Sequence, residues 1–184
     1  IQTDMMTQKE RFNYLQSPSF QMAELPYLNA RYSMLLLMPL DGTLEQMMAS
    51  MDQPALQTNL DAMAMGEVIL SMPKFKFESS FSLSQTLQNM GMQDAFSPAK
   101  ADFSGMYTPE GNPLFISDVI HKAFVAVDEE GTEAAAATAV IMEETSAMPA
   151  EEPVKLTFDH PFVFLIRDRQ SGLILFVGRV TDPQ

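Results

Sequence analysis

The chain has 184 residues, of which 46% are hydrophobic and 19% charged, so it is too apolar for a disordered protein and long enough for a packed core. The formal net charge of -13, with 11 Lys and Arg scattered along the sequence, argues against nucleic acid and membrane surfaces as partners. No apolar run approaches the roughly 20 residues that cross a bilayer, and the lack of Cys excludes disulfides and thiolate metal sites.

Apolar segments of strand length dominate the first part of the chain. The alternation from Phe20 to Leu25 and the apolar runs from Ser33 to Pro39 and from Val68 to Pro73 predict three strands. Each of these segments ends at a proline, which cannot donate a ladder hydrogen bond.

Two short helices are predicted between the second and third of these strands. Asp41-Gly42 predicts a turn, and Thr43 is an available N-cap. Four residues then recur at helical spacing: Leu44, Met47, Met48 and Met51. Pro54 is expected to begin a second helix, with four residues on one face: Leu56, Leu60, Met63 and Ala64.

The second half of the chain is read mainly as strands. Phe75 to Phe81 continues as a strand, and Leu83 to Met90 is a helix that Gly91 ends. Ile116 to Val127 predicts a long strand, and its apolar end predicts a central strand covered on both faces. Three more strands are expected at Val154 to Phe158, Phe162 to Ile166 and Leu173 to Val180, the last two as a hairpin. The predicted class is α+β with β predominant.

One stretch, EEGTEAAAATAVIMEETSAMPAEEP, interrupts the strands and holds no aromatic residue and few large aliphatic ones. It cannot fill a core. Composition alone favours a flexible linker or a surface helix, because Ala and Glu are good helix formers.

The chemistry of an enzyme is not apparent. A hydrolytic triad needs a His beside a nucleophile, and both His121 and His160 are interpreted as hydrogen-bonded structural groups. The acidic run from Asp128 to Glu130 is typical of a solvated face and not of a Ca²⁺ loop. No phosphate-binding or metal motif is present, so neither a cofactor nor a metal is predicted.

The remaining motifs resemble the serpin family. AFVAVDEEGTEAAAATAV, followed later by DHPFVFLIRDRQSGLILFVGRVTDP, is similar to the serpin signature. Upstream, MMTQKERFNY, ELPYLNARYSMLLLMP and VILSMPKFKFESSFSLSQTLQNMGMQDAF resemble the family in the same order. The resemblance implies that residues 1–184 are the C-terminal half of a single serpin domain whose N-terminal half is absent. The C-terminal half, which is this chain, should hold parts of the large central sheet, two smaller sheets, short helices and a buried last hairpin. It should also hold an exposed reactive-centre loop at about 131–153.

The resemblance also implies a mechanism. Serpins inhibit serine proteases as suicide substrates, in which the protease cleaves the loop, forms an acyl-enzyme, and is trapped when the loop inserts into the central sheet. The implied partners are a serine protease, held in a covalent acyl complex, and the N-terminal half of the domain. The implied location is extracellular.

The hinge of the loop is the segment best suited to insertion. It comprises Glu129, Glu130, Gly131, Thr132, Glu133, Ala134, Ala135, Ala136, Ala137 and Thr138. In a strand, alternate side chains share a face, and the face that begins at Thr132 and continues through Ala134 to Met142 carries no charge. A passive linker is not expected to keep one alternating face free of charge. This pattern therefore favours a segment that can become a strand by insertion.

The reactive bond is placed by counting from the hinge, which gives Thr145 followed by Ser146. A small residue at this position suits a protease of elastase or subtilisin type. Met142 and Met148 remain alternatives, although Pro149 would hinder cleavage after Met148.

Two further roles come from the resemblance alone. Lys74 and Glu129 match a pair that forms a salt bridge in many serpins, and His121 matches a residue of the shutter beneath the opening sheet. A non-inhibitory carrier or chaperone of the same fold, and an inactive truncated fragment, are the competing hypotheses.

Overall fold

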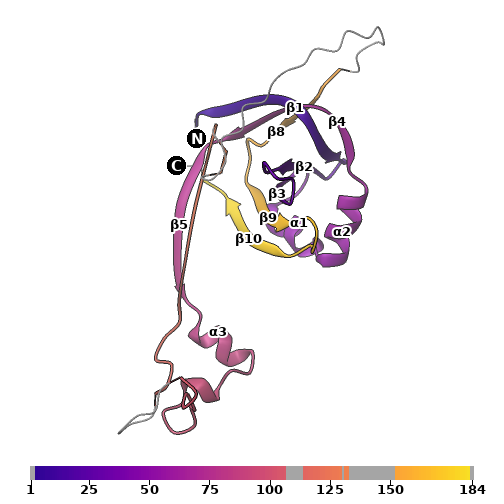
Figure 1. Ribbon diagram of the computed structural model, residues 1–184. Coiled ribbons are helices and arrows are strands. Elements are labelled where there is room, and N and C mark those ends of the chain that lie inside the picture. The colour runs from indigo at the N-terminus through magenta and orange to yellow at the C-terminus, as the bar shows by residue number, and fades with distance from the viewer. Residues whose placement is uncertain (1–2, 107–113, 130, 133–151, 183–184) are drawn as a thin grey trace. The chain divides into compact units, whose positions relative to one another are not determined.

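The computed structural model describes residues 3–106, 114–129, 131–132 and 152–182. The described strands are β1 (Met5–Gln16), β2 (Phe20–Pro26), β3 (Tyr32–Pro39), β4 (Ala64–Pro73), β5 (Phe75–Ser82), β6 (Ile120–Asp128), β7 (Gly131–Thr132), β8 (Val154–Thr157), β9 (Phe162–Asp168) and β10 (Ile174–Val180). The helices are α1 (Leu44–Ser50), α2 (Gln53–Asp61), α3 (Ser84–Asn89) and the short 3-10 helix η1 (Asp94–Phe96). The expected α+β class with β predominant is confirmed, as Figure 1 shows.

The chain divides into two compact units, one of residues 1–76 with 126–184 and one of residues 77–125. The first unit contains a seven-stranded sheet in the order β10-β9-β3-β2-β1-β4-β8. Its ladders are antiparallel except for the last, where β4 and β8 run parallel. The sheet is continuous because β1 is long enough to pair with β2 from Asn13 to Gln16 and with β4 from Met5 to Tyr14. Where the resemblance implies two smaller sheets, the described strands of this unit form one continuous sheet.

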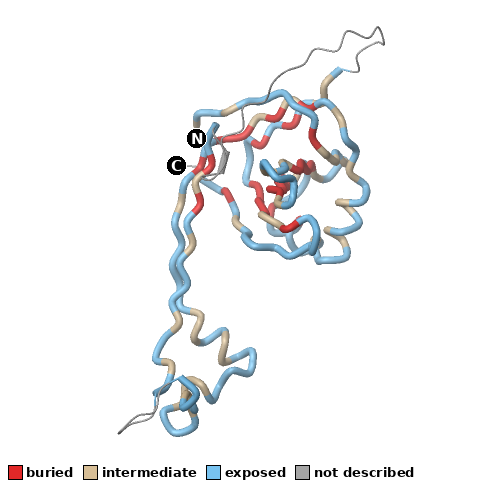
Figure 2. Tube along the Cα trace, in the orientation of Figure 1, coloured by how far each residue is buried: buried red, intermediate tan, exposed pale blue. Residues whose placement is uncertain are grey.

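The core lies on both faces of the central strands. β3 has six consecutive buried residues, and Figure 2 shows the buried positions concentrated in this part of the unit. On one face α1 and α2 pack against an apolar cluster that includes Met22, Leu35 and Leu37. On the other face the rings of Phe75 and Phe164 lie 5.3 Å apart. The run of consecutive apolar residues in the sequence therefore reflects cover on both sides.

The helix α1 is held at its start by a capping box. The Gln46 backbone N–H donates to Thr43 Oγ1 at 3.3 Å, and the Thr43 backbone N–H donates to Gln46 Oε1 at 3.0 Å. The second predicted helix forms, but its predicted end is wrong, since α2 ends at Asp61 and Ala64 already belongs to β4. The apolar pattern in the sequence extends beyond the helix because Met63, in the connecting turn, packs against the same core as the helix.

The three-stranded sheet has the order β5-β6-β7. The long strand begins at Ile120 and not at Ile116 as predicted, because the preceding backbone bonds elsewhere. The Ile116 N–H donates to the Ala95 carbonyl at 2.9 Å, and the Val119 N–H donates to Ser84 Oγ at 2.9 Å. The prediction of cover on both faces is also wrong for this chain, since Phe124 is 43% exposed.

The last hairpin forms as predicted, with β9 and β10 antiparallel, but only one of its strands is buried. The first four residues of β9 are buried, whereas β10 exposes four consecutive apolar residues, from Ile174 to Val177. The buried hairpin implied by the resemblance is thus only half buried here, and β10 is an edge strand of the sheet.

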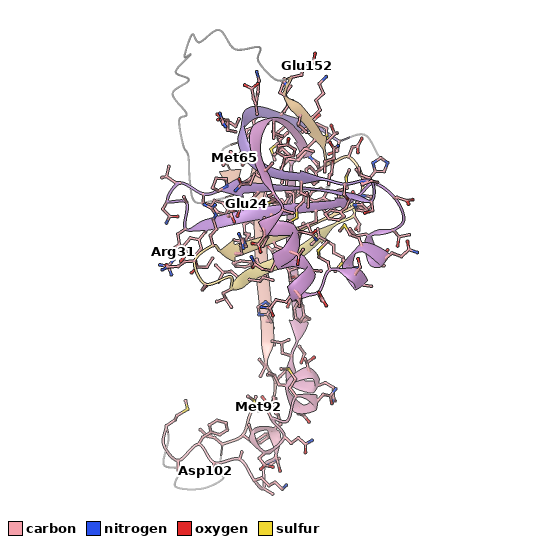
Figure 3. The ribbon with its side chains drawn as sticks, turned by 90° about the vertical axis from the view of Figure 1, so that its right-hand side faces the viewer. Glu24, Arg31, Met65, Met92, Asp102 and Glu152 are labelled. Atoms are coloured by element: carbon pink, nitrogen blue, oxygen red, sulfur yellow. The ribbon has the colours of Figure 1, made fainter. Side chains whose placement is uncertain are left out.

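A charged network is enclosed beside the core. Glu24 is 3% exposed, and its carboxylate accepts hydrogen bonds from Asn13 at 2.8 Å, Ser33 at 2.8 Å and Arg167 at 3.0 Å. Arg169 Nε lies 3.2 Å from the same carboxylate. Figure 3 shows Glu24 inside the unit, with Arg31 at its periphery. Burial alone raises the pKa of Glu24, but these donors and charges outweigh it and hold that pKa below its ordinary value.

The Phe164 ring leaves no space for a side chain at Gly178 on β10. Gly178 stands directly opposite Phe164 in the β9–β10 ladder, and a Cβ at Gly178 would collide with the Phe164 ring. We expect Gly178→Ala to lower the free energy of unfolding by about 1–3 kcal/mol, the usual cost of overpacking. Urea unfolding followed by circular dichroism measures this. Gly105→Ala is the matched control, because a Cβ there meets open space; equal effects of the two changes would contradict the expectation.

Candidate functional site

Two described residues of the predicted hinge, Gly131 and Thr132, pair with β6. After Asp128 the chain reverses, so that Gly131 stands opposite Asp128 and Thr132 opposite Val127 in an antiparallel ladder. Because β5 occupies the other side of β6, this two-residue strand β7 lies along the edge that β5 leaves free. The structure thus places the described start of the hinge on the edge of a strand that can accept more of it.

The two faces of β6 differ in burial. Val125 and Val127 are 8% and 6% exposed, whereas Phe124, which precedes them on the other face, is 43% exposed. Alternate residues of a strand share a face, so His121 and Ala123 belong to the face of the two valines. Any strand added at the free edge of β6 would continue this division.

An ion pair lies at the first residue of the predicted hinge. Lys74, which follows β4, and Glu129, which follows β6, are joined by a distance of 2.6 Å between Nζ and Oε1. The hydrogen bond to Glu129 raises the pKa of Lys74, and the same bond lowers the pKa of Glu129. The two side chains are 47% and 58% exposed. The structure therefore brings together the pair named from the sequence, in a solvent-screened setting.

We expect Lys74→Ala to shift the melting temperature by at most about 3 °C, because exposed ion pairs contribute little to stability. Thermal unfolding at low salt and in 1 M NaCl measures this, and the small difference between variant and parent should vanish in high salt. A fall of about 10 °C or more would show instead that the pair locks the fold.

The two histidines singled out in the sequence do not lie beside the Lys74–Glu129 pair. His121 is exposed on β6, and its ring centroid lies 5.2 Å from that of Phe81 on β5. His160 is exposed and its Nδ1 lies 2.7 Å from Asp159 Oδ1. Neither His lies beside a nucleophile among these described contacts.

A cluster that sequence analysis missed lies where β5 meets α3. Asp118 Oδ1 accepts hydrogen bonds from Ser82 Oγ and Ser84 Oγ, both at 2.5 Å. The bond from Ser82 is the largest cause of a lowered pKa at Asp118. The pair of serines two residues apart at the end of a strand was an available signal, but Asp118 had been assigned to the interior of a strand.

The rest of the loop falls outside the described residues. These undescribed positions are Glu130, Glu133, Ala134, Ala135, Ala136, Ala137, Thr138, Met142, Thr145, Ser146 and Met148. Within the described ranges no helix has the length and apolarity to cross a membrane. The same ranges contain no group of three or more potential metal ligands.

Comparison with known proteins places the whole chain in one group. A family model described as "Serpin (serine protease inhibitor)" matches residues 1–183. An uncharacterized serpin-like protein of Thermococcus kodakarensis is 41% identical over 180 residues, covering 98% of this chain and 41% of that protein. The human leukocyte elastase inhibitor is 41% identical over 191 residues, covering 97% of this chain and 48% of that protein.

Solved structures agree with the fold. Thyroxine-binding globulin in complex with thyroxine matches with a TM-score of 0.79 and 31% identity, covering 100% of this chain and 47% of that one. The chain therefore spans about half the length of the relatives it matches.

Proposed function

Because the chain belongs to the serpin family, we propose that, within a complete serpin domain, it inhibits serine proteases as a suicide substrate. The family model that matches the chain is described as one of serine protease inhibitors. In the proposed reaction the protease cleaves the loop and is held as an acyl-enzyme. The hinge then inserts as a new strand along β6 and carries the bound protease with it.

The observation that carries this proposal is the β6–β7 ladder. Its register pairs Thr132 with Val127, and if the ladder continued, Ala134 would stand opposite Val125 and Ala136 opposite Ala123. The face of the hinge that carries no charge would then lie on the face of β6 where Val125 and Val127 are buried. Conversely, Glu133 would fall on the face where Phe124 is exposed. The charge pattern of the loop and the burial pattern of β6 are thus complementary in this register.

The energetics are sufficient for a trap. A strand of about a dozen residues gains on the order of ten ladder hydrogen bonds, at about 0.5–1.5 kcal/mol each. The gain of about 10 kcal/mol is comparable to the stability of a whole domain. Insertion would therefore release enough free energy to distort the protease.

The bait remains a proposal based on counting. Thr145 followed by Ser146 suits a protease with a small or shallow specificity pocket, of elastase or subtilisin type, and Met142 and Met148 are the alternatives. The human leukocyte elastase inhibitor among the relatives supports a target of elastase type. An extracellular location is proposed from family membership alone.

The second proposed partner is the N-terminal half of the domain. The matched relatives are about twice as long as this chain, and β10 exposes apolar residues that include Ile174 and Phe176. Apolar surface of this kind is usually covered. We infer that residues 1–184 form part of one domain and that the N-terminal half supplies the strand that would flank the inserted loop.

Denaturing gel electrophoresis tests the proposal. The complete protein, incubated with an elastase-type protease, should give a complex that survives denaturation, whereas residues 1–184 alone should give none. Simple cleavage of the complete protein with no such complex would make it a substrate. A stable complex formed by this chain alone would contradict the need for a second half.

A carrier role is the second candidate, favoured by a groove of about 830 Å³ between α1, α2 and the sheet. Its walls are mostly apolar, and it is also lined by Arg167, whose buried Nε has no hydrogen-bond partner among the described residues. A structural neighbour binds thyroxine. Heating cleaved and uncleaved protein discriminates, because an inhibitor should gain much stability on cleavage and a carrier need not.

A further inference from the structure

Three cationic side chains gather on one face of three neighbouring strands, although the Lys and Arg residues are scattered in sequence. In the β1–β4 ladder Lys9 stands opposite Ile69 and Arg11 opposite Glu67; in the β4–β8 ladder Lys155 also stands opposite Ile69. Directly opposed residues share a face. The resulting β8 patch consists of Lys9, Arg11, Glu67, Ile69, Lys155 and Thr157.

Two contacts establish that this is one surface. Lys9 Nζ lies 3.1 Å from Glu67 Oε1, and in the next pair on the same face, bordering the patch, the hydroxyls of Thr7 and Ser71 lie 2.9 Å apart. The opposite face of the same strands carries buried residues, among them Leu70 and Leu156. The β8 patch is therefore the outer face, and Figure 1 shows β1, β4 and β8 as neighbours.

The charge of the β8 patch is opposite to that of the chain. The patch holds three cations and one carboxylate, whereas the chain as a whole has a formal charge of -13. Lys9 is paired with Glu67, but neither Arg11 nor Lys155 has an ion-pair partner among the described residues. An extended polyanion would be repelled by the rest of the chain. The complementary partner is one that presents a local acidic area.

The position of the patch points to the protease. β8 directly follows the loop, and Figure 3 shows Glu152 where the described chain resumes before this strand. Ser146 precedes Val154 by eight residues, which reach at most about 28 Å when extended. A protease bound at the reactive bond therefore lies within reach of the β8 patch.

We propose that the β8 patch is a docking surface for the target protease, which meets it with acidic residues beside its active site. This inference rests on the proposed inhibitory function. Charges at the rim of an interface act mainly on the association rate. The patch accordingly selects, among proteases that accept the same bait, those with an acidic rim.

The experiment compares association rates. Lys155→Glu in the complete protein is assayed by progress curves, in 20 mM and 500 mM NaCl, with the elastase-type protease that forms the denaturation-resistant complex. We expect about a tenfold slower association at low salt, and a much smaller difference at high salt. Lys100→Glu is the matched control. It makes the same change at an exposed lysine of the other compact unit, and less than about a twofold effect is expected.

Each outcome decides between the two proposals. If the parent protein forms no complex, the proposed function fails and this inference falls with it. If the complex forms but Lys155→Glu associates as fast as the parent or as Lys100→Glu, the docking surface is wrong while the inhibitory function stands. If a sulfated polysaccharide accelerates the parent but not Lys155→Glu, the patch binds a polyanion and the assignment to the protease is overturned.

Discussion

Ala136→Arg should convert the complete protein from an inhibitor into a substrate. In the register set by Thr132 opposite Val127, Ala136 would enter on the face where Val125 is buried. Burying an unpaired guanidinium costs several kcal/mol, and each increment of about 1.4 kcal/mol slows a step tenfold. Hydrolysis of the acyl-enzyme would then outrun insertion. The stoichiometry of inhibition should rise at least about tenfold, and the denaturation-resistant complex should disappear.

The matched control is Ala135→Arg. This neighbouring residue would stand opposite Phe124, which is 43% exposed, so the new charge keeps access to water. We expect Ala135→Arg to retain a stoichiometry within about twofold of the parent, since a solvated charge costs little. If both substitutions abolish inhibition equally, the proposed register is wrong. If neither does, the hinge does not insert.

Glu24→Ala is expected to have the largest effect on stability. It removes the carboxylate that Arg167 and Arg169 share, and Arg167 is only 13% exposed. Breaking a buried charged pair from one side costs about 3–5 kcal/mol. Denaturant unfolding should show this loss, whereas Lys100→Ala, which breaks an exposed pair with Asp94, should leave the midpoint nearly unchanged.

The same network predicts a pH dependence. The folded-state pKa of Glu24 lies below its ordinary value of 4.5, so its contribution to stability is complete above about pH 4.5 and is lost as the pH falls through the lower folded-state value. The difference in unfolding free energy between parent and Glu24→Ala should narrow in that acidic range. A difference that stays constant from neutral pH to pH 3 would show that the loss comes from packing alone.

Local sequence patterns predicted the elements that depend on local rules. The cap at Thr43 and the strand from Ser33 to Pro39 are confirmed because capping and continuous apolarity are set by a few neighbouring residues. The start of the long strand was wrong, since Ile116 to Val119 bond to a segment that is distant in sequence. Periodicity contains no information on such competition.

Some features of the candidate site could be predicted from the sequence and others could not. The pairing of Lys74 with Glu129 was available only through the resemblance, because 55 residues separate them. The β6–β7 ladder and the gathering of Lys9 with Lys155 depend on strand order, which composition does not determine. The absence of charge from one face of the hinge was visible in the sequence, but its meaning requires the register of β6.

Hydrogen exchange at β6 tests the central claim most directly. In the uncleaved protein, the amides of β6 that face away from β5 should exchange readily along most of Ile120–Asp128, because among the described residues only Gly131 and Thr132 pair with that edge. After cleavage by the protease, alternate amides of β6 should become strongly protected as the hinge inserts. Unchanged exchange at β6 in the cleaved protein would contradict insertion and with it the proposed inhibitory mechanism.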